Sequence, residues 1–225
     1  MKLSILCVTK GEPFAMRFLW EMMQLAHELT TSGQETELVF GLDGLGCGNG
    51  AMIREMADVW LPVNSAGYLE SVLDTVVRAC NGEYVLRLDD DERVSPALAE
   101  WLQGGNFQAA EHWKFPRAHF WGDDKHVITN GPLWPDHQTR LSRKHLAGGR
   151  GVIHAGSPHG GGELAPAVIE HHKFLVKSRQ ERQRIAYTYD RVMAGAGTGG
   201  FLAFNLPEWA FPFLQVAEYC GGYCP

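Results

Sequence analysis

Four acidic residues stand side by side at the end of an apolar, strand-like run in the stretch YVLRLDDDER. Asp89, Asp90, Asp91 and Glu92 would repel one another, and each would raise the pKa of its neighbours unless a cation offsets the charge. Mg²⁺ and Mn²⁺ prefer carboxylate oxygens and commonly complete their shells with water and substrate phosphates. The spacing of Asp89 and Asp91 therefore predicts a divalent metal presented to a diphosphate, and it leaves the roles of Asp90 and Glu92 open.

The segments around these acids predict how they are positioned. In the first hundred residues, strand-like and helix-like patterns alternate, which is typical of parallel βαβ units in an open, doubly wound α/β sheet with helices on both faces. Ligands bind to such sheets beyond the carboxyl ends of the strands, where the acidic run lies. The expected strands cover residues 3–8, 36–42, 59–63 and 83–88, and the expected helices cover 13–29, 51–56 and 68–80.

Beyond Pro96 the pattern becomes mixed. A polar helix is expected over about 177–193, where the run SRQERQR is typical of a solvated face. The tail 195–225 is too apolar for a disordered linker, so we expect it to pack on or cover the site. Before these lie one short expected helix, at 97–102, and strand-like segments at 112–121, 125–129 and 138–144, separated by turns.

The composition narrows the class of protein. The chain has 225 residues, of which 45% are hydrophobic, enough for a buried core, and its net charge of −6 offers no basic footprint for a polyanion. The first apolar run is too short for a signal peptide, and no segment is long enough to span a membrane, so we expect a cytoplasmic protein. Five cysteines without paired spacing predict reduced thiols.

Two glycine-rich motifs do not complete the sites they are typical of. GCGNGA at 46–51 matches a dinucleotide fingerprint, but the strand after it ends in Asn64 and Ser65 instead of the acid that would hold a ribose. HGGG at 159–162 is similar to an esterase oxyanion loop, but the sequence contains no G-x-S-x-G nucleophile elbow. We interpret both as glycine-rich turns.

Four segments of the chain resemble, in order, the motifs of family-2 glycosyltransferases with the GT-A fold: LSILCVTKGEP, VFGLDG, NGEYVLRLDDDE and WPDHQTRLSRK. The resemblance extends from about Lys2 to Tyr189. It implies an open mixed sheet and a metal-dependent, inverting transfer of a sugar from a nucleoside-diphosphate sugar, with a UDP-sugar favoured, to an acceptor hydroxyl. It also implies that residues 1–95 bind the donor and that 96–194 carry the acceptor-binding and catalytic groups.

The resemblance further implies which residues carry the chemistry. Asp136 would be the general base, because a carboxylate within reach of an acceptor hydroxyl can take its proton as the new bond forms. Asp89 and Asp91 would hold Mn²⁺ or Mg²⁺ as the D-x-D motif. His154 would be a further metal ligand, and His171 is the second choice for that role.

The donor and acceptor contacts are implied in the same way. Trp121 and Trp134 would offer flat faces to an acceptor sugar, and core packing explains each of them equally well. The second acid usual after the second strand is missing from LDGLG, which leaves the identity of the donor open. The donor contacts would be Thr9, Lys10, Glu12, Asp43, Asp89, Asp90 and Arg140.

Two other functions compete with a glycosyltransferase. A nucleotidyltransferase would need a glycine-rich, basic loop after the first strand, and TKGEP is a poor version of it. An inactive sugar-nucleotide-binding module would not need Asp89, Asp91 and Asp136, which are all present. The acceptor stays open among a glycan, a lipid-linked glycan, a small metabolite and, with least support from the acidic net charge, modified DNA. A homo-oligomer is compatible with the sequence, which does not specify the oligomeric state.

Overall fold

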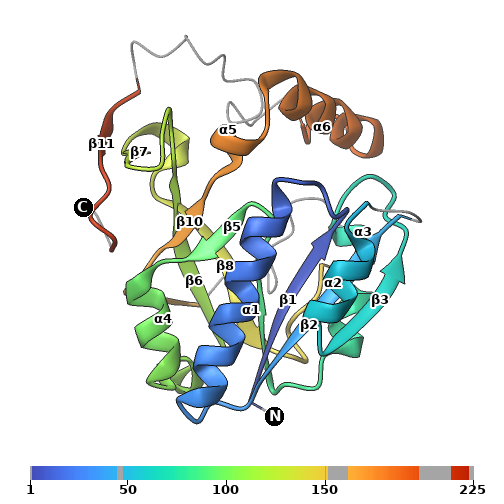
Figure 1. The fold of residues 1–225 in the computed structure, drawn as a ribbon. Helices are drawn as coiled ribbons and strands as arrows, with labels where there is room; N and C mark the ends of the chain where they lie inside the picture. The colour runs from blue at the N-terminus through green and yellow to red at the C-terminus, as the bar shows by residue number, and fades with distance from the viewer. Residues whose placement is uncertain (1, 45–47, 150, 152–161, 198–213, 223–225) are drawn as a thin grey trace.

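The computed structural model describes residues 2–44, 48–149, 151, 162–197 and 214–222 (Figure 1). Within these ranges, nine strands form one mixed sheet in the order β3-β2-β1-β4-β8-β6-β10-β5, with β9 paired to β6. Helices lie on both faces of the sheet, and α5 and α6 lie above the end of β1 (Figure 1). No described helix has the length and hydrophobicity needed to cross a membrane.

The N-terminal part of the sheet is parallel, as the alternating pattern predicts. Its strands are β1 (Leu3–Thr9), β2 (Thr36–Asp43), β3 (Val59–Val63) and β4 (Tyr84–Arg87). Leu3 pairs with Thr36 of β2 and with Tyr84 of β4, so these strands begin at a common level. Because the strands are parallel, their carboxyl ends meet at one edge of the sheet, and the residues that follow β1, β2 and β4 come together there.

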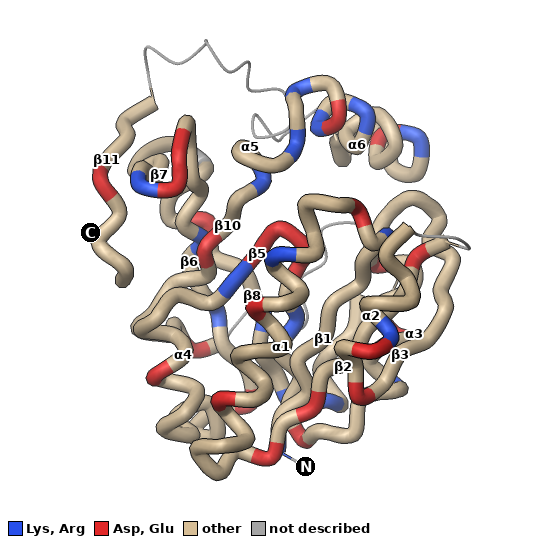
Figure 2. The backbone as a smooth tube through the Cα atoms, viewed as in Figure 1, with Lys and Arg blue, Asp and Glu red and all other residues tan. Residues whose placement is uncertain are grey.

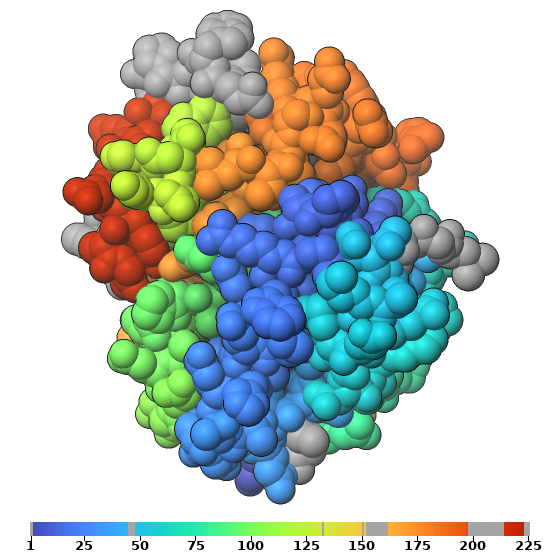
Figure 3. Space-filling view, in the orientation of Figure 1, coloured from blue at the N-terminus to red at the C-terminus, as the bar shows by residue number. Residues whose placement is uncertain are grey.

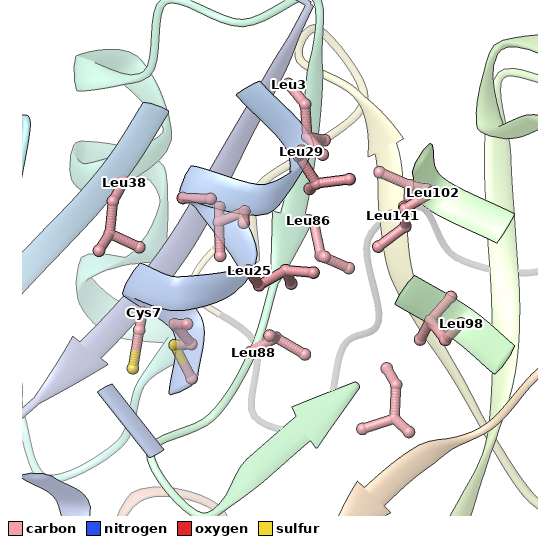
Figure 4. Close-up of a cluster of buried hydrophobic side chains, with 14 of the residues drawn as sticks. Leu3, Cys7, Leu25, Leu29, Leu38, Leu86, Leu88, Leu98, Leu102 and Leu141 are labelled. Atoms are coloured by element: carbon pink, nitrogen blue, oxygen red, sulfur yellow. The ribbon is translucent and has the colours of Figure 1, made fainter. Parts of the chain in front are cut away.

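The core of this part forms because β1 is apolar on both faces. Leu3, Ile5 and Cys7 point to one face and pack in a cluster with α1 (Ala15–Thr31), α2 (Gly50–Met56) and α4 (Pro96–Gln103), as Figure 4 shows in part. Leu6, one residue out of phase, packs on the other face with Val76 of α3 (Glu70–Ala79). Each fully buried side chain of this size contributes roughly 1.5–3 kcal/mol relative to exposure.

The later part of the chain continues the same sheet with strands of mixed direction. β8 (Asp136–Arg143) is antiparallel to β4, and β6 (His112–His119) is antiparallel to β8. β10 (Ile169–His171) runs parallel to β6, and β5 (Glu92–Val94) closes the sheet antiparallel to β10. The acidic residues therefore lie in the turn between β4 and β5, two strands that pair at separate places in the sheet.

The remaining described elements are η1 (Asn106–Ala109), β7 (His126–Ile128), η2 (Gly131–Leu133), β9 (Glu163–Leu164), α5 (Lys173–Val176), α6 (Arg179–Val192) and β11 (Val216–Glu218).

The structure differs from the sequence expectations at several points. β5, β9, β10 and α5 were not expected, because elements of two to four residues carry almost no periodic signal. The expectation of reduced thiols is wrong for Cys220, which is disulfide-bonded, and correct for Cys7 and Cys80, which are free and buried. Residues 216–218 of the tail pair with β7, and Tyr219 packs edge-on against Phe120. The stretch 198–213 of the tail lies outside the described residues.

Candidate active site

A cavity of about 530 Å³ opens at the carboxyl edge of the parallel strands, below α5 and α6. Figure 3 shows the α5–α6 segment lying directly against the N-terminal part of the chain, and Figure 2 shows its basic positions above the acidic ones at the sheet edge. Among the described residues, acidic and basic side chains are equally represented in the lining. The acids are Glu12, Asp43, Asp89, Asp90, Asp91 and Glu181, and the bases are Lys10, Arg117, Lys173, Lys177, Arg184 and Arg191.

Glu92 holds the acidic turn from below. Its side chain is 0% exposed, and its Oε2 accepts a hydrogen bond of 3.1 Å from the backbone N–H of Asp89. Its Oε1 accepts from Arg117 at 3.1 Å and from Arg140 at 2.6 Å. Arg140 also donates to Asp89 Oδ2 at 2.6 Å. Glu92 is therefore a buried support that fixes the position of Asp89, which answers the question that the sequence leaves open.

Asp90 is tied to the end of β1. Thr9 Oγ1 donates to Asp90 Oδ2 at 2.9 Å and itself accepts from the N–H of Gly11 at 3.0 Å. Burial is the main effect that raises the pKa of Asp90, to about 6, and the charge of Asp91 adds to it. Asp90 thus faces the cavity and not bulk solvent, and its protonation state is sensitive to the charge that enters the site.

Asp91 is contacted by two basic groups. Lys177 Nζ lies 2.6 Å from Asp91 Oδ2, and His171 Nε2 lies 3.3 Å from Asp91 Oδ1. Burial opposes the ionisation of Asp91, yet Lys177 and His171 together hold its pKa well below the usual range. Lys173, on α5 in the same cavity, has its pKa lowered by burial to about 8. The acidic turn is therefore ionised at Asp91 and partly neutralised by Lys177.

A chain of buried contacts connects Asp91 to Asp136. Asp136 Oδ2 lies 3.0 Å from His119 Nε2, His119 Nδ1 lies 3.0 Å from His171 Nδ1, and His171 Nε2 contacts Asp91. Burial lowers the pKa of both histidines, so each is neutral and brings one ring proton. Two protons cannot serve three contacts.

The contacts with His171 and His119 help to lower the pKa values of Asp91 and Asp136, so we assign one ring proton to each of these two contacts. His171 Nε2 then donates to Asp91, and His119 Nε2 donates to Asp136. The 3.0 Å contact between the two Nδ1 atoms is the one without a proton.

Asp136 is engaged on both of its oxygens. Arg117 Nε donates to Asp136 Oδ2 at 2.8 Å, and Gln138 Nε2 donates to Oδ1 at 2.8 Å. Although burial opposes its ionisation, the charge of Arg117 and the contact with His119 hold the pKa of Asp136 well below the usual range. Asp136 is not among the described residues that line the cavity, whereas its partner Arg117 is.

The contacts expected for the donor are brought together in part. Thr9, Lys10, Glu12 and Asp43 all line the cavity with the acidic turn. Asp43 is fixed by Ser65, whose backbone N–H donates to Oδ1 at 2.8 Å and whose hydroxyl donates to Oδ2 at 2.6 Å. The parallel strand ends thus deliver these side chains to one place.

Other expected site residues lie elsewhere. Arg140 is 1% exposed and supports the acidic turn from beneath, away from the cavity lining. Trp121 packs in a hydrophobic cluster with Phe174, and Trp134 packs in a second cluster of the later part of the sheet. His154 lies outside the described residues. No set of three or more His, Cys, Asp or Glu side chains within the described ranges is arranged to hold a metal ion.

Several residues of the cavity were not expected from the sequence. The polar helix α6 is not solvated on every side, because its residues Glu181, Arg184 and Thr188 line the cavity. These positions are three to four residues apart and share one helix face, so helical periodicity could have grouped them but not oriented them. Arg117, Lys173 and Lys177 carry no motif that marks them.

Comparisons with known proteins support the fold. No family model matches the sequence, and no curated protein matches it. TarS 1–349 from S. aureus superposes with a TM-score of 0.53 at 12% identity, over 84% of this chain and 66% of that one. The same fragment in complex with UDP-GlcNAc gives 0.53 at 13% identity, over 84% and 67%. A longer TarS structure gives 0.51 at 13% identity, over 84% and 40%.

At these identities the likeness concerns the fold alone. It confirms the expected α/β fold of GT-A type, an open mixed sheet with helices on both faces. The chain spans only 40% of the longer TarS structure, so nothing about that whole protein is carried over to this one.

Proposed function

We propose that the chain is a family-2-type glycosyltransferase that moves a sugar from a nucleoside-diphosphate sugar, with a UDP-sugar favoured, to an acceptor hydroxyl with inversion. One observation carries the proposal: the cavity gathers Thr9, Asp43 and the acidic turn 89–91 at the carboxyl edge of parallel strands, opposite the basic side chains of α5 and α6. A fold of this kind binds ligands at that edge. The likeness to a structure that holds UDP-GlcNAc supports the same assignment.

We propose that a divalent ion, Mn²⁺ or Mg²⁺, binds on the side of the cavity at Asp91, where one or two carboxylates would hold it and water and the diphosphate would complete its shell. The carboxylate of Asp91 offers oxygen ligands of the kind that such an ion prefers. Asp89 Oδ1 is buried without a hydrogen-bond partner among the described residues, and we assign it as a further ligand. When bound, the ion supplies positive charge against the departing nucleoside diphosphate. His154 remains a proposed additional ligand.

We keep Asp136 as the proposed general base, and Arg117 controls how strongly it can accept a proton. The guanidinium of Arg117 contacts Asp136 and also lines the cavity. A donor diphosphate attracts Arg117, and a weaker contact with Arg117 raises the proton affinity of Asp136. Base catalysis of this kind typically contributes about a hundredfold to ten-thousandfold.

The acceptor is proposed to bind on the side of residues 96–194, with the donor on the side of 1–95. Trp121 and Trp134 are both only partly buried, and their remaining exposed surface is proposed to contact the acceptor. The acceptor itself is a hydroxyl compound whose class is left to experiment.

Donor hydrolysis tests the proposal without a known acceptor. The protein is incubated with Mn²⁺ and a panel of nucleoside-diphosphate sugars, and released nucleoside diphosphate is measured beside calorimetric binding of UDP. We expect one UDP-sugar to be hydrolysed slowly, Asp91→Ala to lose the gain in UDP affinity that Mn²⁺ gives the parent, and Asp136→Asn to bind UDP but release little. Asp124→Ala, the same kind of change at an exposed acid outside the cavity, is the matched control.

Three outcomes would reject this proposal. A gain in UDP affinity on adding Mn²⁺ that is as large in Asp91→Ala as in the parent rules out the site. Pyrophosphate release from a nucleoside triphosphate, with no turnover of any nucleotide sugar, identifies a nucleotidyltransferase instead. Binding of UDP-sugars with no release under any condition identifies an inactive binding module.

A further inference from the structure

Lys177 is the cation closest to the acidic turn among the described residues that line the cavity. It lies between α5 and α6, with Nζ 2.6 Å from Asp91 Oδ2 and 3.6 Å from Asp90 Oδ1. Its side chain is 14% exposed, and its Nζ lies 5.1 Å from the centroid of the Phe14 ring. Its backbone carbonyl accepts a hydrogen bond of 2.6 Å from Arg182 Nη1 of α6. The ammonium group is therefore held in the cavity by contacts at both ends of the residue.

The charge of Lys177 acts in opposite directions on the two expected ligands. An ammonium that shares the carboxylate of Asp91 with a divalent ion repels that ion, because both are positive and lie close together. The same ammonium attracts a diphosphate, which brings negative charge close to the three aspartates of the acidic turn. Asp91 offers Oδ1 on the side of His171 and Oδ2 on the side of Lys177, so both cations can contact it at once.

We propose that Lys177 is a built-in counter-ion that lets a nucleoside diphosphate bind without metal and keeps metal affinity low until the diphosphate is present. This inference rests on the proposed function for the nature of the ligand. Divalent ion and nucleotide then bind cooperatively, because the phosphates supply the negative charge that offsets Lys177. Thermodynamic linkage requires that each ligand strengthens the binding of the other by the same factor.

Substitution of Lys177 by methionine tests the inference. Methionine keeps an unbranched stem over Phe14 and removes the charge. Mn²⁺ binding without nucleotide is measured by electron paramagnetic resonance, and UDP binding is measured by calorimetry in EDTA and again in saturating Mn²⁺. We expect Lys177→Met to bind Mn²⁺ alone on the order of tenfold more tightly, and UDP in EDTA on the order of tenfold more weakly.

Two control variants separate charge from structure. Lys177→Arg keeps the charge and should shift both affinities far less than Lys177→Met. Arg179→Gln removes one positive charge from an exposed position at the start of α6, outside the cavity lining, and should leave both affinities unchanged. Thermal unfolding of each variant confirms that the compared proteins are folded.

The opposite signs of the two shifts make the outcome decisive. If Lys177→Met loses affinity for Mn²⁺ and for UDP together, or changes neither, Lys177 is not the counter-ion and the inference is wrong. In that case, UDP binding by the parent protein still leaves the proposed function standing. If the parent binds UDP neither with nor without Mn²⁺, the proposed function itself is refuted, and the inference falls with it.

Discussion

Removal of Arg140 is the most direct test of how the acidic turn is built. The Arg140 side chain is 1% exposed and donates one 2.6 Å hydrogen bond to Asp89 and another to Glu92, which is 0% exposed. In Arg140→Met, Asp89 loses its guanidinium partner, and Glu92 keeps Arg117 and the backbone N–H of Asp89. Loss of one partner from a fully buried ion pair costs about 3–5 kcal/mol, because the remaining charge is left uncompensated. Burial already raises the pKa of Glu92 to about 8, so Glu92 can take up a proton, and Asp89 is 29% exposed. We therefore expect a loss in the free energy of unfolding at or below the lower end of that range, about 1–3 kcal/mol.

Urea denaturation followed by circular dichroism measures this loss against a matched control. Arg17→Met removes an arginine whose side chain is 58% exposed and whose ion pair with Glu21 lies on the surface of α1. Such pairs contribute about 0–1 kcal/mol, so the control should be nearly neutral. If Arg140→Met lowers the free energy of unfolding no more than Arg17→Met does but abolishes UDP binding, then Arg140 contacts the donor directly. Its assigned role as a support of Asp89 and Glu92 would then be wrong.

A double-mutant cycle adds a second check on the same reasoning. In the Arg140→Met background, Glu92→Gln removes one of the two carboxylates that the arginine compensated. The two changes should therefore cost less together than the sum of their separate costs, with a coupling of about 0.5–3 kcal/mol. Strict additivity would show that Arg140 and Glu92 do not act as a pair.

Three further predictions concern ionisation. The pKa of Asp136 is held low in the fold, so its stabilising contribution is present above its unfolded pKa of about 3.9 and is lost as the pH falls. Urea unfolding should therefore show that the free energy of unfolding falls less between pH 6 and pH 3 for Asp136→Asn than for the parent. Because burial lowers the pKa of Lys173 to about 8, an amine-reactive reagent at pH 8.5 should label Lys173 ahead of exposed lysines, and UDP should protect it, as read by mass spectrometry. Burial raises the pKa of Cys7 and that of Cys80, the latter to about 12, so both thiols should resist alkylation at pH 8 until the protein is unfolded.

The parallel half of the fold was open to prediction because its pattern is local. Each strand from β1 to β4 is an apolar run next to a helix-like run, and the parallel arrangement places Thr9, Asp43 and the acidic turn at one edge. The four strands and three helices expected there were confirmed to within a few residues at their ends. The later strands β5 and β10 were missed, since three residues show no period and their pairing joins segments more than seventy residues apart.

The sequence by itself determined which acids stand together and at which end of which strands they stand, since a D-D-D-E run after a strand needs no partner to be recognised. Only the tertiary structure decided what surrounds them. Arg117, Arg140, His171 and Lys177 reach the turn through the register of β6, β8 and β10 and through the path of α5 and α6 over the sheet edge. The physical reason is that a charged residue on a polar segment has the same sequence pattern whether it faces water or a buried carboxylate, and only long-range packing distinguishes the two.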